Sequence, residues 1–152
     1  MRALVRSEVV VAAPATVVWD YVTDWPRQGE WIPLTRVEVV PPGGEASGVG
    51  DRIRAWTGLG PVGFWDTMTI TFWATDPDGS ARCEVLHTGA VVRGDGEFAV
   101  LAEGPGRCRF VWWERLDVPG VPGAVARRHR RHDGLGRAQE DGVDDAAPAD
   151  GA

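Results

Sequence analysis

Apolar and polar residues alternate over several short stretches of the chain, and this spacing predicts β-strands. The clearest example is residues 64–73, where mainly apolar residues at even positions alternate with threonine and tryptophan at odd positions. A period of two, with β-branched and aromatic residues, is typical of a strand. Asp66 also lies at an even position. It therefore directs a carboxylate toward the otherwise apolar face.

Similar patterns, separated by turn sequences, predict six further strands. Asp76-Pro77-Asp78-Gly79 and Gly104-Pro105-Gly106 are strong hairpin signals between them. The expected strands cover residues 3–11, 34–40, 51–57, 64–74, 81–88, 91–101 and 107–118.

A helical pattern interrupts the strands only once. Pro14 suits the first position of a helix, and apolar residues at 17, 18, 21, 22 and 25 recur at helical spacing until Pro26. Residues 27–31 predict a second short turn. One strand, a helical pair and six strands in succession indicate an α+β domain whose antiparallel sheet curls around its apolar face.

Gly58, Gly60 and Gly63 form the spacing G-x-G-x-x-G, which is known from dinucleotide-binding proteins. In those proteins the glycines end a strand and open a helix, whose N-terminus holds the pyrophosphate. Pro61 and the following strand pattern leave no such helix. The glycines therefore predict a flexible turn between antiparallel strands.

Composition narrows the class of protein. The 152 residues suit one domain, and the net charge of −6 argues against general nucleic-acid binding. No apolar run has the length of a membrane span, and the N-terminus is a poor signal peptide, so we expect a soluble cytoplasmic protein. Cys83 and Cys108 match no metal spacing and are expected to be buried thiols. Nothing in the sequence calls for a metal or cofactor.

The segment AAPATVVWDYVTDWPRQGEWIP, together with the order of elements, resembles the START/SRPBCC superfamily of helix-grip proteins. That superfamily includes polyketide cyclases, lipid carriers and coenzyme Q-binding proteins. The resemblance covers about residues 3–118 and implies a hydrophobic cavity between sheet and helices. It does not imply one activity, because these proteins share a cavity and not a catalytic motif. It also implies a long C-terminal helix across the concave sheet.

The C-terminal part of the sequence departs from that family pattern. We place a ligand-binding domain at residues 1–118 and a polar tail at 119–152, where four sparse apolar residues and several glycines support a helix poorly. The tail is open to three interpretations, which are disorder, a partial helix over 121–139, and a frame-shifted end of the reading frame. The run RRHRRH at 127–132 offers two histidines among arginines, and acidic residues follow it, so a solvated polyampholyte is favoured over a zinc site.

Three ionisable residues are candidates for chemistry. If Cys83 and Val85 point to the concave side of the sheet, His87 does too, and by the same parity Glu114 shares a face with its apolar neighbours. Together with Asp66 they place two carboxylates and an imidazole among apolar side chains, where such groups must pair or bind a ligand. A carboxylate beside an imidazole is a general acid/base pair. The alternative is a structural role in which they bind Arg54, Arg93 or a tryptophan N–H.

The expected cavity wall is aromatic, although ordinary core packing would explain the same residues. Trp65 and Trp73 are expected on the outer face. The predicted wall consists of Trp31, Trp56, Met68, Phe72, Phe98 and Trp112.

Three hypotheses of function follow. The first is a carrier or sensor of a small hydrophobic or aromatic molecule. The second is an aromatase, cyclase or dehydratase that uses Asp66, His87 and Glu114. The third is a truncated or frame-shifted family member without activity. An open concave face would also allow a homodimer.

Overall fold

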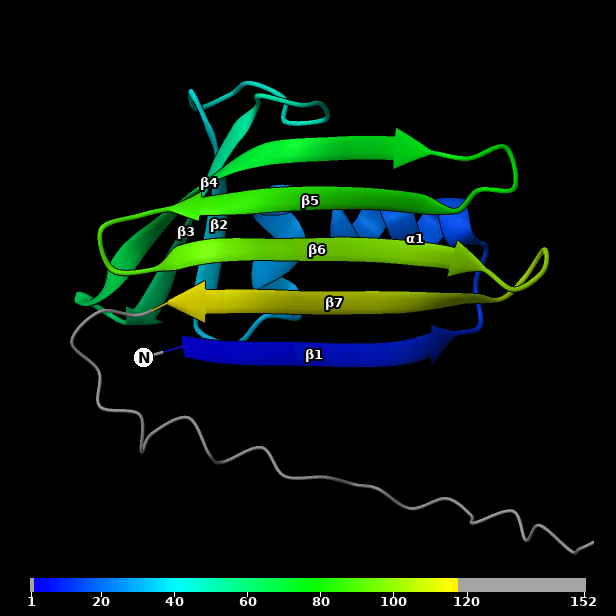
Figure 1. The fold of residues 1–152 in the computed structure, drawn as a ribbon, viewed down its shortest axis with the longest axis horizontal. Helices are drawn as coiled ribbons and strands as arrows, with labels where there is room; N and C mark the ends of the chain where they lie inside the picture. Colours follow the sequence, from blue (N-terminus) through cyan, green and yellow to red (C-terminus); the bar gives the residue numbers. More distant parts are fainter. Residues whose placement is uncertain (1, 118–152) are drawn as a thin grey trace, which may run out of the picture.

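The computed structural model describes residues 2–117, which form a seven-stranded antiparallel sheet with two short helices against one face (Figure 1). The chain begins with β1 (Arg2–Val11), the helix α1 (Ala15–Val22) and the 3₁₀ helix η1 (Trp25–Glu30). The remaining strands are β2 (Thr35–Val40), β3 (Arg52–Leu59), β4 (Val62–Thr75), β5 (Ala81–Thr88), β6 (Arg93–Ala102) and β7 (Cys108–Asp117). The predicted α+β class, the seven strands and the helical pair after the first strand are confirmed.

Within the sheet the strand order is β1-β7-β6-β5-β4-β3-β2. Strands β2 to β7 are therefore a simple meander, and β1 joins it by pairing with β7 over the whole length of both strands. In Figure 1, β2 and β3 turn away from the direction of β5, β6 and β7, so the sheet curls around α1 and η1. The predicted tail at 119–152, with its basic run and the proposed helix at 121–139, lies outside the described residues.

The glycine motif forms a turn, as predicted. β3 ends at Leu59 and β4 begins at Val62, so only Gly60 and Pro61 connect them. Gly60 has a φ of 57°, a conformation that glycine adopts without strain. Gly58 and Gly63 face each other across the two strands, and a Cβ at Gly58 would collide with the backbone of Gly63. The two glycines therefore allow the strands to approach closely beside the turn.

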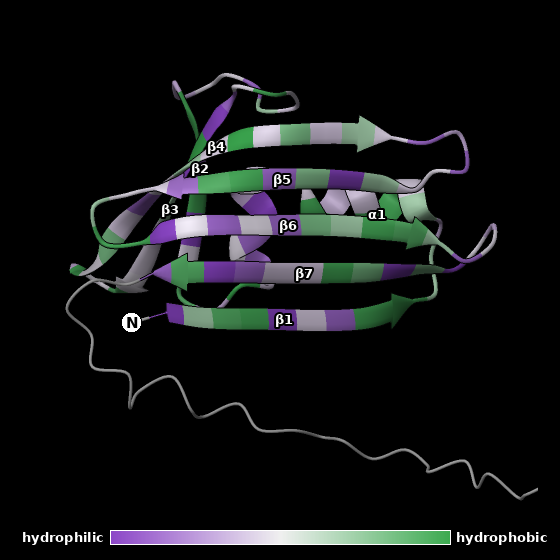
Figure 2. Ribbon diagram, in the orientation of Figure 1, coloured by the Kyte–Doolittle hydropathy of each residue, from purple (hydrophilic) through white to green (hydrophobic). Residues whose placement is uncertain are grey.

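The core lies between the concave face of the sheet and the two helices. Alternating strand residues point inward, as the alternating burial along β5 shows. Figure 2 shows hydrophobic and hydrophilic residues interspersed along the strands. Ile53, Ile70, Val100, Cys83 and Cys108 are almost completely buried. Both cysteines are free thiols, as expected. Burial raises the pKa of Cys83 to about 12, so this thiol is a packing residue and not a nucleophile.

A β-bulge in β4 changes which of its residues point inward. The register shifts between Ile70 and Phe72, because Ile70 pairs with Val85 whereas Phe72 pairs with Glu84. After the bulge, Trp73 points to the core, and its ring lies 5.0 Å from that of Trp19. The prediction that Trp73 lies on the outer face is therefore wrong. A strict alternation cannot reveal an inserted residue.

The helices do not cover the concave face evenly. A groove of about 500 Å³ lies between α1 and the strands β1 and β7. Its walls include Val9 and Val11 of β1, Val17 and Tyr21 of α1, and Phe110 of β7. Val9 is 50% exposed and Val17 is 56% exposed. Among the described residues, the part of the concave face along β1 and β7 is therefore apolar but open.

Candidate functional site

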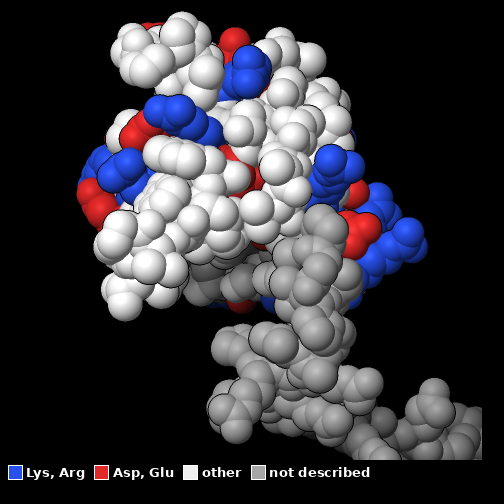
Figure 3. Space-filling model, turned by 90° about the vertical axis from the view of Figure 1, so that its left-hand side faces the viewer, with Lys and Arg blue, Asp and Glu red and all other residues white. Residues whose placement is uncertain are grey.

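A second hollow of about 300 Å³ lies on the concave face, at the end of the sheet that carries the β3–β4 turn. Figure 3 views the molecule from this end, where uncharged residues form most of the surface and arginines lie toward its edges. Ile53, Ala55, Met68, Val85 and Phe98 supply apolar wall. The same cavity is lined by Asp66, His87 and Glu114. The structure thus brings the three predicted polar residues together in one place.

Asp66 and His87 form the best-defined contact of the site. His87 of β5 is opposite Met68 of β4, so Asp66 lies two residues farther along the neighbouring strand. The distance from His87 Nδ1 to Asp66 Oδ2 is 2.7 Å. Because a carboxylate oxygen accepts hydrogen bonds, Nδ1 carries a hydrogen and donates the hydrogen bond. Nε2 is consequently the nitrogen that remains for other partners.

Glu114 approaches His87 from a strand that is not its neighbour. The distance from His87 Nε2 to Glu114 Oε1 is 3.8 Å, although β6 separates β5 from β7. The residue of β6 between them is Gly96, which pairs with Glu114 on β7. A Cβ at Gly96 would lie 3.4 Å from His87 Nε2 and 3.1 Å from Glu114 Cγ. The absence of a side chain at this position therefore lets the imidazole and the carboxyl group meet.

The environment shifts the proton affinity of both groups. Burial alone lowers the pKa of His87, but the hydrogen bond to Asp66 and the charges of Asp66 and Glu114 raise it, and the net pKa is above its ordinary value of 6.5. Burial also raises the pKa of Glu114. The charge of His87 and the indole of Trp112 lower this pKa, but by less than burial raises it. Both groups therefore hold a proton more strongly than they would in water.

This arrangement can exchange protons with a bound molecule. His87 Nε2 and Asp66 Oδ1 are buried and have no hydrogen-bond partner among residues 2–117. Asp66 orients the ring through Nδ1, and the free Nε2 can accept or donate a proton at the cavity. Glu114, with its raised pKa, can supply a second proton. The chemistry available is thus hydrogen bonding to a polar group, or general acid/base catalysis.

The structural alternative of pairing with Arg54 does not hold, because that side chain binds elsewhere. Arg54 donates from Nη2 to Glu38 at 2.8 Å on the opposite face of the sheet, where it also stacks on the ring of Trp65. No group of three or more His, Cys, Asp and Glu residues within 2–117 is arranged to hold a metal ion. The histidines of the basic run lie outside the described residues.

Of the six predicted wall residues, the structure places three directly in the cavity. They are Met68, Phe98 and Trp112. Trp31 lies beside them, with its ring 6.2 Å from that of Phe98 and 5.9 Å from that of Trp112 in edge-on contacts. It lines the open groove instead, and Trp112 contributes to both hollows. Trp31 and Trp112 therefore form the boundary between the cavity and the groove.

The remaining two wall predictions are wrong. Trp56 pairs with Trp65 across β3 and β4, and their rings lie 5.4 Å apart on the convex face. Ile53, Ala55 and Thr57 of β3 point to the concave face. Trp56 therefore points to the convex face. Phe72 also lies outside because of the bulge, and Arg82 lies 4.4 Å from the centre of its ring.

Other residues of the site give no signal in the sequence. Gln28 of η1 is buried, donates from Nε2 to the backbone oxygen of Val22 at 2.8 Å, and contributes to the cavity. A 3₁₀ turn has no hydrophobic period that marks its inward face. Gly96 is the other omission. The strand pairing places it opposite Glu114, and its surroundings in the folded sheet place it beside His87. Knowledge of the register would have been needed to find it.

The family described as polyketide cyclase/dehydrase and lipid transport matches residues 2–146. The chain belongs to this family. The predicted resemblance to the START/SRPBCC superfamily is thereby confirmed. Because the match extends beyond residue 118, the boundary between domain and tail stays a prediction. No protein among the curated sequences matches the chain.

Solved structures support the family's fold. An aromatase/cyclase from Streptomyces is 22% identical, with a TM-score of 0.58 over 80% of this chain and 72% of the other. A START superfamily protein from Mycobacterium smegmatis is 16% identical, with a TM-score of 0.60 over 80% and 82%. A human lipid transfer and protein localization domain is 20% identical, with a TM-score of 0.59 over 82% and 68%. At these identities the likeness concerns the fold alone.

Neither helix of the described residues has the length and apolar character that crossing a membrane requires.

Proposed function

We propose that this protein binds a small aromatic or otherwise hydrophobic molecule that carries one polar group, as a carrier or sensor. The observation that carries the proposal is the pair of unsatisfied atoms, Asp66 Oδ1 and His87 Nε2, in a mainly apolar cavity. A buried polar atom without a partner costs about 1–3 kcal/mol. A ligand hydroxyl or carbonyl at this position would recover that free energy.

The size of the cavity restricts the ligand. Ligand pockets commonly enclose roughly 300–1,000 Å³, and this cavity of about 300 Å³ is at the small end. We therefore expect a compact ring system and not a long acyl chain. Phe98 and Trp112 in the cavity wall favour aromatic ligands as well, because aromatic rings pack edge-on or offset against one another.

A paired titration tests this proposal. Tryptophan fluorescence would follow the binding of naphthol and of naphthalene, which have the same rings and differ by one hydroxyl group. We expect the protein to bind naphthol at least about tenfold more tightly, equivalent to one hydrogen bond of roughly 1.4 kcal/mol. His87→Ala should remove the preference and leave naphthalene binding nearly unchanged. Equal affinities in the unmodified protein would refute the proposed polar subsite.

The geometry of the polar trio supports a second function, acid/base catalysis of the cyclase or dehydratase type. His87 is oriented by Asp66 at 2.7 Å, and its free nitrogen lies 3.8 Å from a carboxyl group with raised pKa. Such a pair can remove a proton next to a carbonyl group and return one to the oxygen, as enolisation, aldol cyclisation and dehydration require.

The two functions differ in their response to Asp66→Asn. Native mass spectrometry of protein purified gently from its host would identify a bound molecule to serve as substrate. A carrier should bind that molecule only a few times more weakly after the substitution, whereas an enzyme should lose its turnover while retaining binding. A protein that is empty in every preparation and binds neither naphthol nor the host's small molecules would instead support the inactive-member hypothesis. A cytoplasmic location stays a prediction.

A further inference from the structure

The outer edge of β1 is unusually open to pairing. β1 is ten residues long and contains neither proline nor glycine. Among residues 2–117 it pairs with β7 only, so its other edge presents free backbone donors and acceptors. Leu4 is 74% exposed beside it, and Val5, Val9 and Val10 are also exposed. A long edge strand without proline or glycine, with exposed apolar side chains beside it, favours the addition of another strand.

The opposite edge of the sheet differs in its length, in the residues that follow it and in its covering. β2 has only six residues, and Pro41 and Pro42 follow it directly. It also packs against η1. Short length, proline and a covering element are the usual means by which proteins prevent pairing at an edge. Their presence at β2 makes their absence at β1 informative.

We infer that β1 pairs with β1 of a second copy of this chain, antiparallel and centred on Ser7. In this register Arg6 of each copy lies opposite Glu8 of the other. Leu4 then faces Val10, Val5 faces Val9, and Ala3 faces Val11. A register centred on Arg6 or on Glu8 would place like charges directly opposite each other, which is unfavourable. The sequence of β1 is thus complementary to itself in one register.

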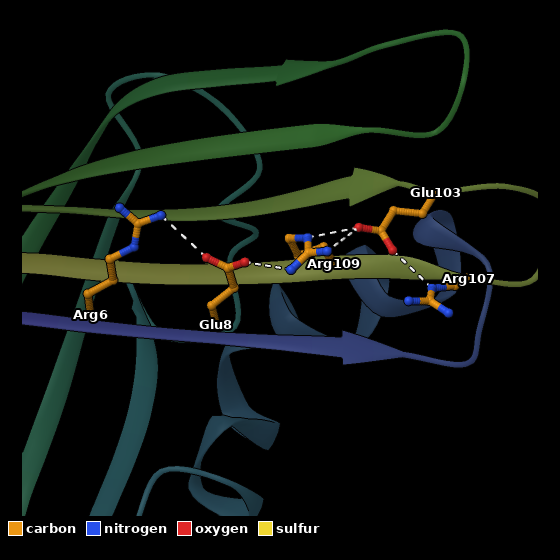
Figure 4. Close-up of polar contacts among 5 residues, drawn as sticks. All are labelled: Arg6, Glu8, Glu103, Arg107 and Arg109. Carbon is orange, nitrogen blue, oxygen red and sulfur yellow. Dashed lines mark hydrogen bonds and ion pairs between the residues drawn. The ribbon is translucent and has the colours of Figure 1, made fainter. Parts of the chain in front are cut away.

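The same register suits both faces of the sheet. Ser7, Val9 and Val11 of β1 line the open groove, and Val5 lies on the same face, so the two grooves would approach each other across the paired strands. Even-numbered residues lie on the convex face, where a row of ion pairs ends at Arg6, whose side chain is 66% exposed. A second copy would extend the row, because Glu8 of that copy would lie beside Arg6. Such a two-fold interface uses the same strand from both copies. The row consists of Arg107, Glu103, Arg109, Glu8 and Arg6 (Figure 4).

Sedimentation velocity of the full chain over a range of concentrations tests the inference. The unmodified protein should form a dimer, and Leu4→Lys should weaken it about tenfold or more, since a charge would replace the contact with Val10. Leu59→Lys is the matched control, because Leu59 is also 74% exposed but lies at the β3–β4 turn. It should dimerise like the unmodified protein. Circular dichroism would verify that each variant folds.

Charge substitutions test the register. Arg6→Glu should weaken the dimer, because the introduced carboxylate of one copy would lie opposite Glu8 of the other. The double variant Arg6→Glu with Glu8→Arg should restore dimerisation, since opposite charges then face each other again. A protein that is monomeric at every soluble concentration, or a dimer that neither Leu4→Lys nor Arg6→Glu weakens, would overturn the β1 interface. Failure of the double variant to restore the dimer would overturn the Ser7 register.

Discussion

The two halves of the concave face have the same alternation of apolar residues but very different surroundings. Beneath α1 and η1, Ile53 and Ile70 are 1% and 0% exposed. On β1, which no described element covers in this way, Val5 and Val9 are 42% and 50% exposed. Alternation determines the side to which a residue points. Whether that residue is buried depends on the elements that cover it.

The difference also bears on where the buried ionisable residues lie. Asp66, His87 and Glu114 occupy the covered half, where burial shifts the pKa of His87 and Glu114. Low local polarity strengthens hydrogen bonds and charges, and it makes unpaired polar atoms costly. The open groove is lined by ten residues of which none is charged. It offers apolar surface without a carboxyl or imidazole group.

The largest expected effect concerns packing. Ile70→Ala should lower the free energy of unfolding by about 2–5 kcal/mol, because it leaves a void in the covered half. Val9→Ala, its counterpart on the open half, should change it by about 0.5 kcal/mol or less. Urea unfolding of dilute protein, followed by fluorescence, would measure both. Similar losses at the two sites would show that something covers the groove in solution.

Asp66→Asn should have the next largest effect. It removes the carboxylate that holds His87, so the free energy of unfolding should fall by about 1–3 kcal/mol. The pKa of His87 should also fall, because burial then outweighs the remaining charges. His87 is the only histidine in residues 2–117, and its imidazole can be titrated by NMR. An unchanged or higher pKa in the variant would contradict the assigned role of Asp66.

A smaller effect is expected in the pH dependence of stability. Because the folded pKa of His87 is raised, its contribution to stability is present below about 6.5 and is lost as the pH rises through the folded value. The difference in unfolding free energy between the unmodified protein and His87→Gln should therefore decrease as the pH rises above 6.5. Urea titrations on either side of that pH would measure it. A difference that grows with pH would mean that the folded pKa is lowered.

The smallest effect should come from the convex face. Arg109 binds Glu8 and Glu103, and these contacts lower the pKa of both carboxyl groups. All three side chains are in contact with solvent, so Arg109→Ala should destabilise the protein only slightly. The loss should become smaller still in high salt. Thermal unfolding at low and high ionic strength would measure this loss of stability. A large loss that does not depend on salt would mean that Arg109 stabilises the protein through packing instead.

Much of the site could be predicted because strand parity is a local property. The inward direction of Cys83 and Val85 places His87 on the same face, and the same reasoning places Glu114 beside its apolar neighbours on β7. Asp66 follows from the alternation before the bulge. The faces on which these three residues lie could be predicted without knowing which strands pair.

The errors arise where parity is interrupted or where pairing matters. The bulge after Ile70 exchanges the faces on which Phe72 and Trp73 lie, and no residue in β4 indicates the bulge in the sequence. Trp56 is different, because the alternation of β3 already places it on the face opposite to Ile53 and Ala55. The prediction that Trp56 lines the cavity relied on its residue type and not on this alternation. Covering elements are the least predictable part, since burial of a face depends on segments distant in sequence.

The glycine at position 96 has a consequence for how such sites can change over evolution. It lies between the side chains of His87 and Glu114, and a single methyl group there would meet both. One codon change could therefore push the two side chains apart, although the new methyl group would also meet the backbone oxygen of Trp113. The reverse change could couple them in a relative that only stores its ligand. A family that contains both cyclases and carriers could move between these activities through a position that carries no functional group of its own.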